Sequence, residues 1–376
     1  MNEKNTLKEL ATLFLKLGII GFGGPAVHIA MMQDEVVVKK KWMSEQHFLD
    51  LVGATNLIPG PNSTEMAIHI GQERAGWRGL LVAGICFIFP AVLITGCFAW
   101  MYKEYGQLPE IKPFLYGIQP AIIAIIIMAI FPLVKKSLKT VELRILGLIA
   151  LILALLNFNQ IYILFGAGIF ALLTTTIRKN NFNSLTVLPL LISQIPKTTV
   201  ATVTNLNLFL VFLKIGAILY GSGYVLFAFL DAELVAKGLL SRATLIDAIA
   251  VGQFTPGPVF SSVTFIGYQL KGIMGAIVST IGIFLPSFLF VALLNPLVKK
   301  MRDSIPFSIF LDAVNVASLA LIIAICFQMG LHIIMDRRTI LIALISFAVA
   351  LKYKKTNSAV IVLGGSLMGY LLTFIG

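Results

Sequence analysis

Long runs of apolar residues, separated by short polar loops, dominate this sequence. A helix needs about 20 apolar residues to cross a bilayer, and several runs approach or exceed that length. The pattern predicts an all-α polytopic membrane protein with spans at 10–32, 78–102, 113–134, 142–156, 160–177, 206–230, 274–296, 306–333, 338–352 and 357–375.

Two further segments, 46–74 and 243–271, are each a pair of short apolar runs that meet at Pro-Gly-Pro. Prolines cannot continue the helical hydrogen bonds, and the glycine lowers helix propensity further. Each segment is therefore predicted to be a re-entrant helical hairpin, with a tip of irregular backbone buried in protein or lining a polar cavity. The alternatives are a tight turn between two ordinary helices and hairpin arms that both cross the membrane.

The same motifs occur twice in the same order. Phe14-Leu-Lys-Leu-Gly18 corresponds to Phe212-Leu-Lys-Ile-Gly216, and Pro59-Gly60-Pro61 corresponds to Pro256-Gly257-Pro258. A membrane protein with two such copies and interrupted helices has the sequence pattern of a secondary transporter.

The duplication predicts two transporter repeats, residues 1–177 and 206–376. The linker between them, 178–205, is rich in Asn, Ser, Thr and Pro. About five spans per half is an odd number, so the second half would enter the membrane from the opposite side. The halves are therefore predicted to be inverted-topology repeats.

Composition agrees with a membrane protein. Hydrophobic residues make up 58% of the chain and charged residues 12%, against about 25% charged in soluble domains. The net charge of +12 comes mainly from short loops, which indicates positive-inside anchoring in a cell membrane and not nucleic-acid binding. One side carries roughly twice the Lys and Arg of the other, which predicts that this side is cytoplasmic and both termini are outside.

Several kinds of chemistry have no motif here. The sequence contains no GxxxxGK[ST] phosphate loop and no HExxH pair, so neither ATP-driven transport by this chain alone nor zinc proteolysis is expected. The cysteines, Cys86, Cys97 and Cys326, lie in apolar segments without metal or disulfide spacing. We expect no enzymatic activity, no cofactor and no metal site.

The hairpin tips are the main candidates for substrate binding. Asn, Ser and Thr follow each Pro-Gly-Pro and favour a helix start, where free N–H groups and the helix dipole attract anions. Two such starts, related by a pseudo-two-fold axis, would face each other near the membrane midplane. The candidate residues at the tips are Pro59, Gly60, Pro61, Asn62, Ser63, Thr64, Pro256, Gly257, Pro258, Ser261 and Ser262.

Lys16 and Lys214 are equivalent lysines in otherwise apolar segments. A charge within a span is costly, so each is a candidate cation beside the anion path. The alternative is that each side chain reaches to the nearer membrane surface. Gly23, Gly24 and Gly221 interrupt the same segments and are consistent with either close helix packing or an unwound stretch beside the substrate.

Candidate proton-coupling residues are Glu65, Asp50, Asp247 and His28. Glu65 is the strongest, since it follows the first tip and its equivalent in the second half is Ser262, so the symmetry fails there. Its alternative role is to stabilise its own helix start. Asp50 and Asp247 are equivalent positions, with solvated hairpin bases as the alternative. His28 has no equivalent histidine.

The combined pattern resembles the chromate ion transporter family in its long-chain form with two homologous halves. The motifs that carry the resemblance are Phe22-Gly-Gly-Pro25, Asn56-Leu-Ile-Pro-Gly-Pro-Asn62-Ser-Thr-Glu65-Met66 and Gly76-Trp77, and in the second half Gln253-Phe-Thr-Pro-Gly-Pro-Val259 and Phe265-Ile-Gly-Tyr268. They lie within roughly 10–100 and 208–295.

This resemblance implies efflux of chromate, with sulfate as a similar oxyanion, by alternating access at a midplane site between the repeats. Membrane lipid is an expected partner and a homodimer a possible assembly. Alternatives are transport of sulfate or another oxyanion, an anion channel, and a membrane scaffold without transport.

Overall fold

The computed structural model describes residues 3–179, 204–302, 304–353 and 357–372. Every regular element in these ranges is helical, as the sequence predicts. The elements are α1 (Glu3–Ile20), α2 (Pro25–Gln33), the π-helix η1 (Asp34–Lys39), α3 (Glu45–Thr55), α4 (Asn62–Tyr105), α5 (Lys112–Ser137), α6 (Val141–Leu155), α7 (Gln160–Lys179), α8 (Asn205–Ile218), α9 (Val225–Leu230), the π-helix η2 (Asp231–Val235), α10 (Arg242–Phe254), the 3-10 turn η3 (Val259–Ser261), α11 (Ser262–Arg302), α12 (Ile305–Ile333), α13 (Arg337–Lys352) and α14 (Ser358–Leu372).

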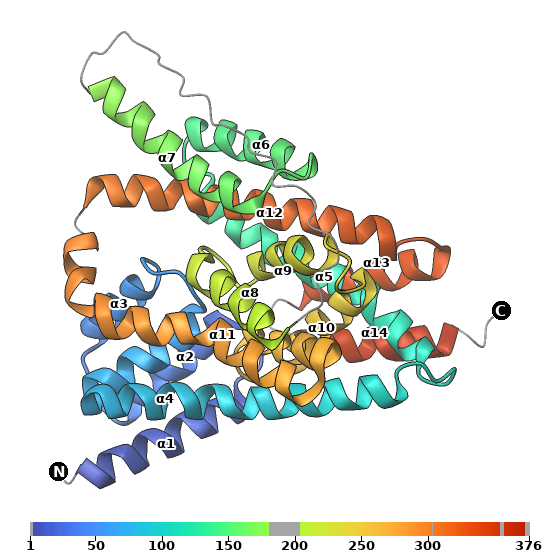
Figure 1. Ribbon diagram of the computed structural model, residues 1–376, viewed down its shortest axis with the longest axis horizontal. Helices are drawn as coiled ribbons and strands as arrows, with labels where there is room; N and C mark the ends of the chain where they lie inside the picture. The colour runs from blue at the N-terminus through green and yellow to red at the C-terminus, as the bar shows by residue number, and fades with distance from the viewer. Residues whose placement is uncertain (1–2, 180–203, 303, 354–356, 373–376) are drawn as a thin grey trace.

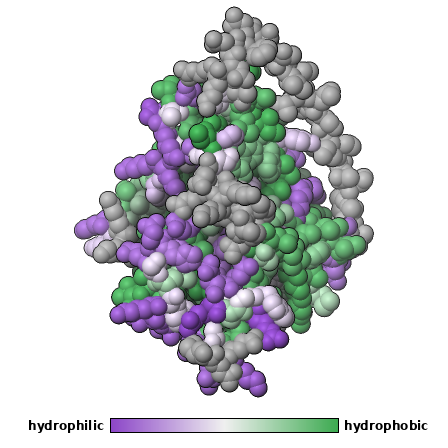
Figure 2. Space-filling view, turned by 90° about the vertical axis from the view of Figure 1, so that its left-hand side faces the viewer, coloured by the Kyte–Doolittle hydropathy of each residue, from purple (hydrophilic) through white to green (hydrophobic). Residues whose placement is uncertain are grey.

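Apolar side chains cover the outside of the long helices. On α4, Leu81, Ile85, Phe89 and Leu93 are all exposed at a spacing of four residues, which places them on one helix face. Within the described part of the chain, α4, α5, Val259–Leu293 and α12 are long and apolar enough to cross a membrane. Figure 2 shows one end of the molecule, where hydrophilic residues gather over the middle and left and hydrophobic residues cover the right flank. The protein is therefore an integral membrane protein.

Helix α4 is two helices joined by a sharp turn. Ala75 (φ −147°, ψ 29°) and Gly76 (φ 59°, ψ −147°) leave the helical conformation. The virtual Cβ of Gly79 would lie 2.0 Å from the Gly71 carbonyl oxygen, so the two arms cross in direct backbone contact. We call the arms α4a (62–74) and α4b (77–105). The contact needs glycine at both positions, because any side chain would separate the arms.

Helix α11 repeats this construction almost angle for angle. Lys271 (φ −142°, ψ 21°) and Gly272 (φ 62°, ψ −149°) form the turn, and Gly267 meets Gly275 as closely as Gly71 meets Gly79. We call its arms α11a (262–270) and α11b (273–302). The predicted hairpin segments thus end at these turns, and the spans predicted from 78 and 274 begin just after them.

The first predicted span of each half is interrupted. Between α1 and α2 the backbone is unwound, with Gly23 at φ 111° and Gly24 at φ 82°. The following segment returns along α1, since Glu35 of η1 contacts Lys16 and lines a surface hollow together with Lys8. The expected single span at 10–32 is therefore a pair of short helices. The sequence left close helix packing and an unwound stretch as alternatives for these glycines. Gly23 and Gly24 lie in an unwound stretch.

The second half breaks in the same way between α8 and α9, where Gly221 has φ 97°. The order of elements then matches the first half throughout: a broken helix pair, a short helix, Pro-Gly-Pro, a helix with a sharp turn, and three more helices. Most of the expected linker, 178–205, lies outside the described residues. Helix α1 begins at one end of the molecule and α14 ends at the other (Figure 1).

Candidate functional site

Each Pro-Gly-Pro tip docks onto the break in the other half. The Gly60 N–H donates to the Leu219 carbonyl at 2.9 Å, and the Gly257 N–H donates to the Gly21 carbonyl at 2.8 Å. Leu219 and Gly21 occupy equivalent places in the breaks after α8 and α1. The two hydrogen bonds are therefore reciprocal, which is what a two-fold relation between the halves produces.

Helix α4b runs from the base of one hairpin to the base of the other. Its first turn packs against Gly71 at the end of α4a. Its last turns contact the second hairpin, where the Gln269 side chain donates to the Ala99 carbonyl at 2.8 Å and the Tyr102 hydroxyl donates to Asp247 at 2.8 Å. At about 1.5 Å per residue, α4b is roughly 40 Å long, enough to cross a bilayer.

A polar cavity of about 280 Å³ lies beside the first tip. Asn56 and Asn62 approach it from the two sides of the Pro-Gly-Pro, and Gly221 and Ser222 from the break in the second half. Helices α5 and α12 close the remaining sides. They contribute Leu133, Lys136, Ser137, Lys139, Ser308, Leu311, Asp312, Asn315, Ser318, Leu319 and Ile322.

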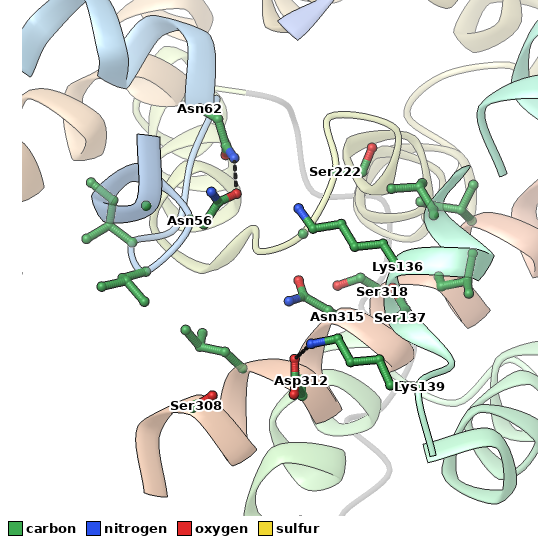
Figure 3. Close-up of a pocket in the computed structure, with 18 residues that line it drawn as sticks. Asn56, Asn62, Lys136, Ser137, Lys139, Ser222, Ser308, Asp312, Asn315 and Ser318 are labelled. Carbon is green, nitrogen blue, oxygen red and sulfur yellow. Dashed lines mark hydrogen bonds and ion pairs between the residues drawn. The ribbon is translucent and has the colours of Figure 1, made fainter. Parts of the chain in front are cut away.

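Hydrogen-bond donors point into this cavity (Figure 3). The Lys136 amino group and the Asn315 amide reach toward Asn56 and Asn62. Among the described residues neither Lys136 nor Asn315 has a hydrogen-bond or ion-pair partner. The Asn62 amide donates one hydrogen to Asn56 at 2.8 Å and keeps a second hydrogen free.

Lys139 is paired with Asp312 at 2.8 Å at the edge of the cavity. This pair is close to neutral, so the Lys136 ammonium gives the cavity a net positive charge. Ser318 donates to the Tyr220 carbonyl at 3.0 Å and so ties α12 to the break in the second half. A cation with several amide and hydroxyl donors is a chemistry suited to an oxyanion.

The second hairpin is held near its base by side-chain contacts with α4b and α5. Asp247 is buried, and its carboxylate accepts hydrogen bonds from Tyr102 at 2.8 Å and from Gln119 at 3.1 Å. The Phe254 ring, at the position equivalent to Leu57, contacts Phe98 with centroids 4.7 Å apart. Gln253, equivalent to Asn56, is buried, and its backbone carbonyl accepts a hydrogen bond from the Ser358 hydroxyl. We call Tyr102, Gln119 and Asp247 the seal.

Of the predicted tip residues, Asn62 lines the cavity and Gly60 makes the contact between the halves. The hydroxyl-bearing residues Ser63, Thr64, Ser261 and Ser262 are buried in the hairpins and do not line it. Ser261 accepts a hydrogen bond from Thr95 at 3.2 Å. The structure brings Pro59 and Pro61 to the cavity's edge between Ile58 and Asn62, whereas Pro256, Gly257 and Pro258 lie at the second tip.

Lys16 and Lys214 each have a carboxylate partner. Lys16 pairs with Glu35 at 2.8 Å, and Lys39 contacts the same carboxylate at 3.1 Å. Lys214 and Lys237 pair with Glu233 in the equivalent arrangement. We call these the lysine–glutamate triads. The second triad carries a net charge of about +1, whereas Lys39 of the first triad also pairs with Asp34 at 2.6 Å, which makes that cluster close to neutral. Neither triad lines the cavity at the first tip.

The first triad lowers the pKa of Glu35. The hydrogen bond from Lys16 favours the charged carboxylate most strongly, burial opposes it, and Lys39 adds a further favourable contact. This ion pair joins η1, which lies outside the long apolar helices, to α1 and so holds the return of the chain along α1.

The proton-coupling candidates occupy different surroundings. Glu65 is fully buried behind the first tip, and its Oε1 lies 3.4 Å from the Ser287 hydroxyl. Asp50 accepts a hydrogen bond from Gln46 at 3.3 Å near the hairpin base. Asp247 belongs to the seal. His28 is buried and places its Nε2 2.8 Å from the Gly21 carbonyl, the acceptor that also receives the Gly257 N–H.

Comparison with known proteins now adds to the geometry. The family model described as "Chromate transporter" matches residues 8–172 and 206–370. The chain belongs to the chromate transporter family. No solved structure matches it.

Curated relatives of this family member match along nearly its whole length. It is 30% identical to a chromate transport protein of Cupriavidus metallidurans, covering 97% of this chain and 92% of the relative. It is 31% identical to a probable chromate transport protein of Synechococcus elongatus, covering 93% and 91%. A chromate transport protein of Pseudomonas aeruginosa is 26% identical, covering 97% and 92%.

Sequence reasoning missed several residues of this transporter's cavity. Asn315 and Ser318 are polar residues three apart in an otherwise apolar span, a signal that was available. Asn56 lies within the motif that carries the family resemblance. Lys136 resembles any other basic residue at the end of an apolar run. Nothing in the sequence shows that the end of α5 approaches the first tip.

Proposed function

We propose that this protein is a secondary transporter of a tetrahedral oxyanion, with chromate as the leading substrate, and that the anion binds in the cavity at the first tip. The observation that carries the proposal is an unpaired Lys136 ammonium facing unsatisfied amides in a membrane-embedded protein. The relatives' designation as chromate transport proteins supports the same substrate.

In this proposal Lys136 supplies the charge and Asn62, Asn315 and Ser222 supply hydrogen bonds. A dianion receives a charge-assisted contact from the ammonium and neutral ones from the amides and hydroxyl. These groups recognise charge and tetrahedral shape, which chromate and sulfate share. We therefore expect sulfate to compete with chromate, and the choice between them to depend on the size of the cavity.

The two halves are proposed to be inverted-topology repeats with re-entrant hairpins. Two observations support this: the reciprocal hydrogen bonds of Gly60 and Gly257, and the course of α4b from the first hairpin base to the second. Since α4b is long enough to cross the bilayer, the two bases would lie on opposite membrane surfaces. The tips then meet near the midplane.

Alternating access follows from the unequal surroundings of equivalent tips. The first tip borders an open cavity, while the second hairpin is bonded to α4b and α5 by the seal of Tyr102, Gln119 and Asp247. In an inverted repeat, exchanging the conformations of the two halves closes the first cavity and opens its counterpart on the other side. We propose that in this conformation the anion cavity is open to one side of the membrane only.

The open cavity is proposed to face the cytoplasm. By the order of the predicted spans, Lys135, Lys136 and Lys139, at and just after the end of α5, fall on the same side as Lys39–Lys41 and Arg74, which is the more basic side. Basic loops favour the cytoplasmic side of a cell membrane. An anion would enter from the cytoplasm and leave outside, the direction of efflux.

The test is exchange of radiolabelled sulfate or chromate in vesicles that contain the purified protein. A transporter loaded with unlabelled anion accumulates labelled anion transiently against its gradient, whereas a channel only dissipates the gradient. We expect transient accumulation with wild type, and a loss of at least roughly tenfold with Lys136→Gln. Lys135→Gln, which alters the neighbouring lysine outside the cavity, is the matched control. Dissipation without accumulation would favour the anion channel.

A further inference from the structure

Glu65 is an acid buried without a cation. Its side chain is fully buried, Oε1 lies 3.4 Å from the Ser287 hydroxyl, and Oε2 has no hydrogen-bond partner among the described residues. No Lys or Arg in the described part of the chain forms an ion pair with it. An ionised carboxylate in such a place is strongly disfavoured, whereas a neutral acid needs only one contact of this kind.

The carboxyl group lies directly against the tip. A Cβ added to Gly60 would come within 2.2 Å of Glu65 Oε1 and 2.6 Å of Ser287 Oγ. Gly60 also has φ 137°, and its N–H makes the hydrogen bond to Leu219. A change in the charge or hydration of Glu65 therefore acts first on the backbone that joins the two halves.

The opposite side of the same tip borders the cavity. Ile58 and Asn62, which flank the Pro-Gly-Pro, both line it, as do Gly221 and Ser222, which follow Leu219. Only the tip and the break in the second half separate Glu65 from a bound anion. A negative charge on Glu65 and a dianion in the cavity would repel each other across poorly polarisable protein.

The second half has no counterpart of this acid. Counted from the glycine pair Gly71 and Gly267, the equivalents of Glu65, Ser287 and His69 are Ser261, Ala91 and Phe265, one residue earlier than the count from Pro-Gly-Pro gives for Glu65 and His69. At the second tip, the virtual Cβ of Gly257 meets the Ala91 methyl at 2.8 Å instead of a carboxyl group. The acid is thus confined to the tip that borders the open cavity.

Resting on the proposed function, we propose that Glu65 is a proton-binding site linked to oxyanion binding. The anion enters the first-tip cavity when Glu65 is neutral, so the protein takes up a proton to the extent that Glu65 is ionised before the anion binds, and the uptake increases as the pH rises. The titratable groups near Glu65 are Tyr220, from the break in the second half, and His69, one turn further along α4a. His69 is also buried, and both of its ring nitrogens lack partners among the described residues, so it is the competing proton site.

The experiment measures proton uptake during sulfate binding to the full-length protein in weakly buffered detergent solution with a pH indicator. Sulfate remains a dianion across the pH range from about 5 to 9, so uptake reports on the protein. We expect wild type to take up as much as one proton per sulfate, and sulfate affinity to strengthen by up to tenfold per unit fall in pH. Glu65→Gln should bind sulfate with neither effect.

Two variants serve as controls. Glu73→Gln removes an exposed carboxylate from the same arm, and His69→Gln removes the competing site; both should retain the proton uptake. Uptake that persists in Glu65→Gln, or is lost in His69→Gln, would overturn the inference. The pH slope of wild-type sulfate affinity tests it independently of whether Glu65→Gln folds, and a flat slope with intact binding overturns it while sparing the proposed function. Absence of oxyanion binding to wild type would overturn both.

Discussion

The two Pro-Gly-Pro tips share a backbone and differ in what covers them. Each glycine N–H reaches the break in the other half at nearly the same distance, and the turns at Gly76 and Gly272 agree within a few degrees. Yet the first tip borders a polar cavity, whereas the second hairpin is bonded to its neighbours by the seal. The repeated backbone fixes where the tips meet, and side chains that are not repeated decide which tip is open.

The charged groups show the same division. Each half pairs one glutamate, Glu35 or Glu233, with two lysines at equivalent positions, so these ion pairs belong to the shared scaffold. Glu65 has no acid at the equivalent position of the other half, whereas Asn315 corresponds to another amide residue, Gln119. We therefore expect substitutions in the scaffold to affect folding in both halves similarly, and substitutions of the unrepeated residues to change binding and coupling.

Gly60→Ala should have the largest effect. The new Cβ would meet the Glu65 carboxyl at 2.2 Å in a backbone conformation that favours glycine. We expect a loss of about 2–5 kcal/mol in stability and no measurable anion flux. Thermal unfolding in detergent and vesicle flux measure these. Gly96→Ala, where a Cβ meets nothing within 4 Å, is the control and should unfold at or above the wild-type temperature.

Gly257→Ala sharpens this comparison. Its Cβ would meet the Ala91 methyl at 2.8 Å, which is a milder clash with a smaller group. We expect a smaller destabilisation than for Gly60→Ala, with a stronger effect on opening of the second tip than on sulfate binding at the first. Equal losses in every measurement would show that the tips are functionally equivalent.

Tyr102→Phe should weaken the seal. It removes the 2.8 Å hydrogen bond to the buried Asp247 carboxylate, an interaction worth about 1–3 kcal/mol. The population with the second tip open should rise accordingly. The measurement is alkylation of Phe254→Cys, in a cysteine-free background, by an impermeant reagent from the outside. Tyr105→Phe, an exposed tyrosine on the same helix, should leave the labelling rate unchanged; no increase in Tyr102→Phe would argue against the seal.

Lys16→Gln and Lys214→Gln should have modest and matched effects. Both lysines are about half exposed and paired, so each substitution should cost about 1 kcal/mol or less in stability. If Lys16 and Lys214 are cations beside the anion path, as the sequence predicts, their substitution should also change anion flux. Each substitution removes one positive charge, which leaves the second triad neutral and the first, where Lys39 also pairs with Asp34, negative. Anion flux should therefore fall, and the fall should shrink at high salt. Unchanged flux would leave these lysines a structural role alone.

The pH dependence of the first triad should be the smallest effect. Lys16 lowers the pKa of Glu35 from its ordinary value of 4.5, so the folded state holds this carboxyl ionised more firmly than the unfolded state. Its stabilising contribution is present above that value and is lost as the pH falls through the lower, folded pKa. Unfolding temperatures measured in acid should therefore drop less steeply in Lys16→Gln than in wild type. Parallel pH curves would contradict this assignment.

Much of this fold follows from the sequence because it rests on local signals. Apolar runs set the helices, and Pro59 and Pro256 with their glycines set the tips. The interruption at Gly23 and Gly24 was recognised as one of two interpretations. The return of the chain along α1 was not predicted, because 10–32 has the hydropathy of a continuous span and only the contact between Lys16 and Glu35 shows the reversal.

The site was harder to predict, because it is assembled from elements far apart in the chain. Residues near the tip motif, such as Asn62 and Glu65, could be identified from the repeat. Lys136 and Asn315 approach the tip only through the packing of α5 and α12 across the halves, which no local pattern encodes. The burial of Ser63 and Thr64 away from the cavity likewise depends on how the hairpin rotates against its neighbours.

The most direct test of the account is equilibrium binding of sulfate and chromate to purified wild type, Lys136→Gln and Lys135→Gln by calorimetry at fixed ionic strength. We expect both anions to compete for one site in wild type and in Lys135→Gln. Lys136→Gln should weaken binding by roughly tenfold or more, since a charge-assisted contact is lost in a partly enclosed cavity. Equal affinity in all three proteins would contradict the claim that the cavity at the first tip is the oxyanion site.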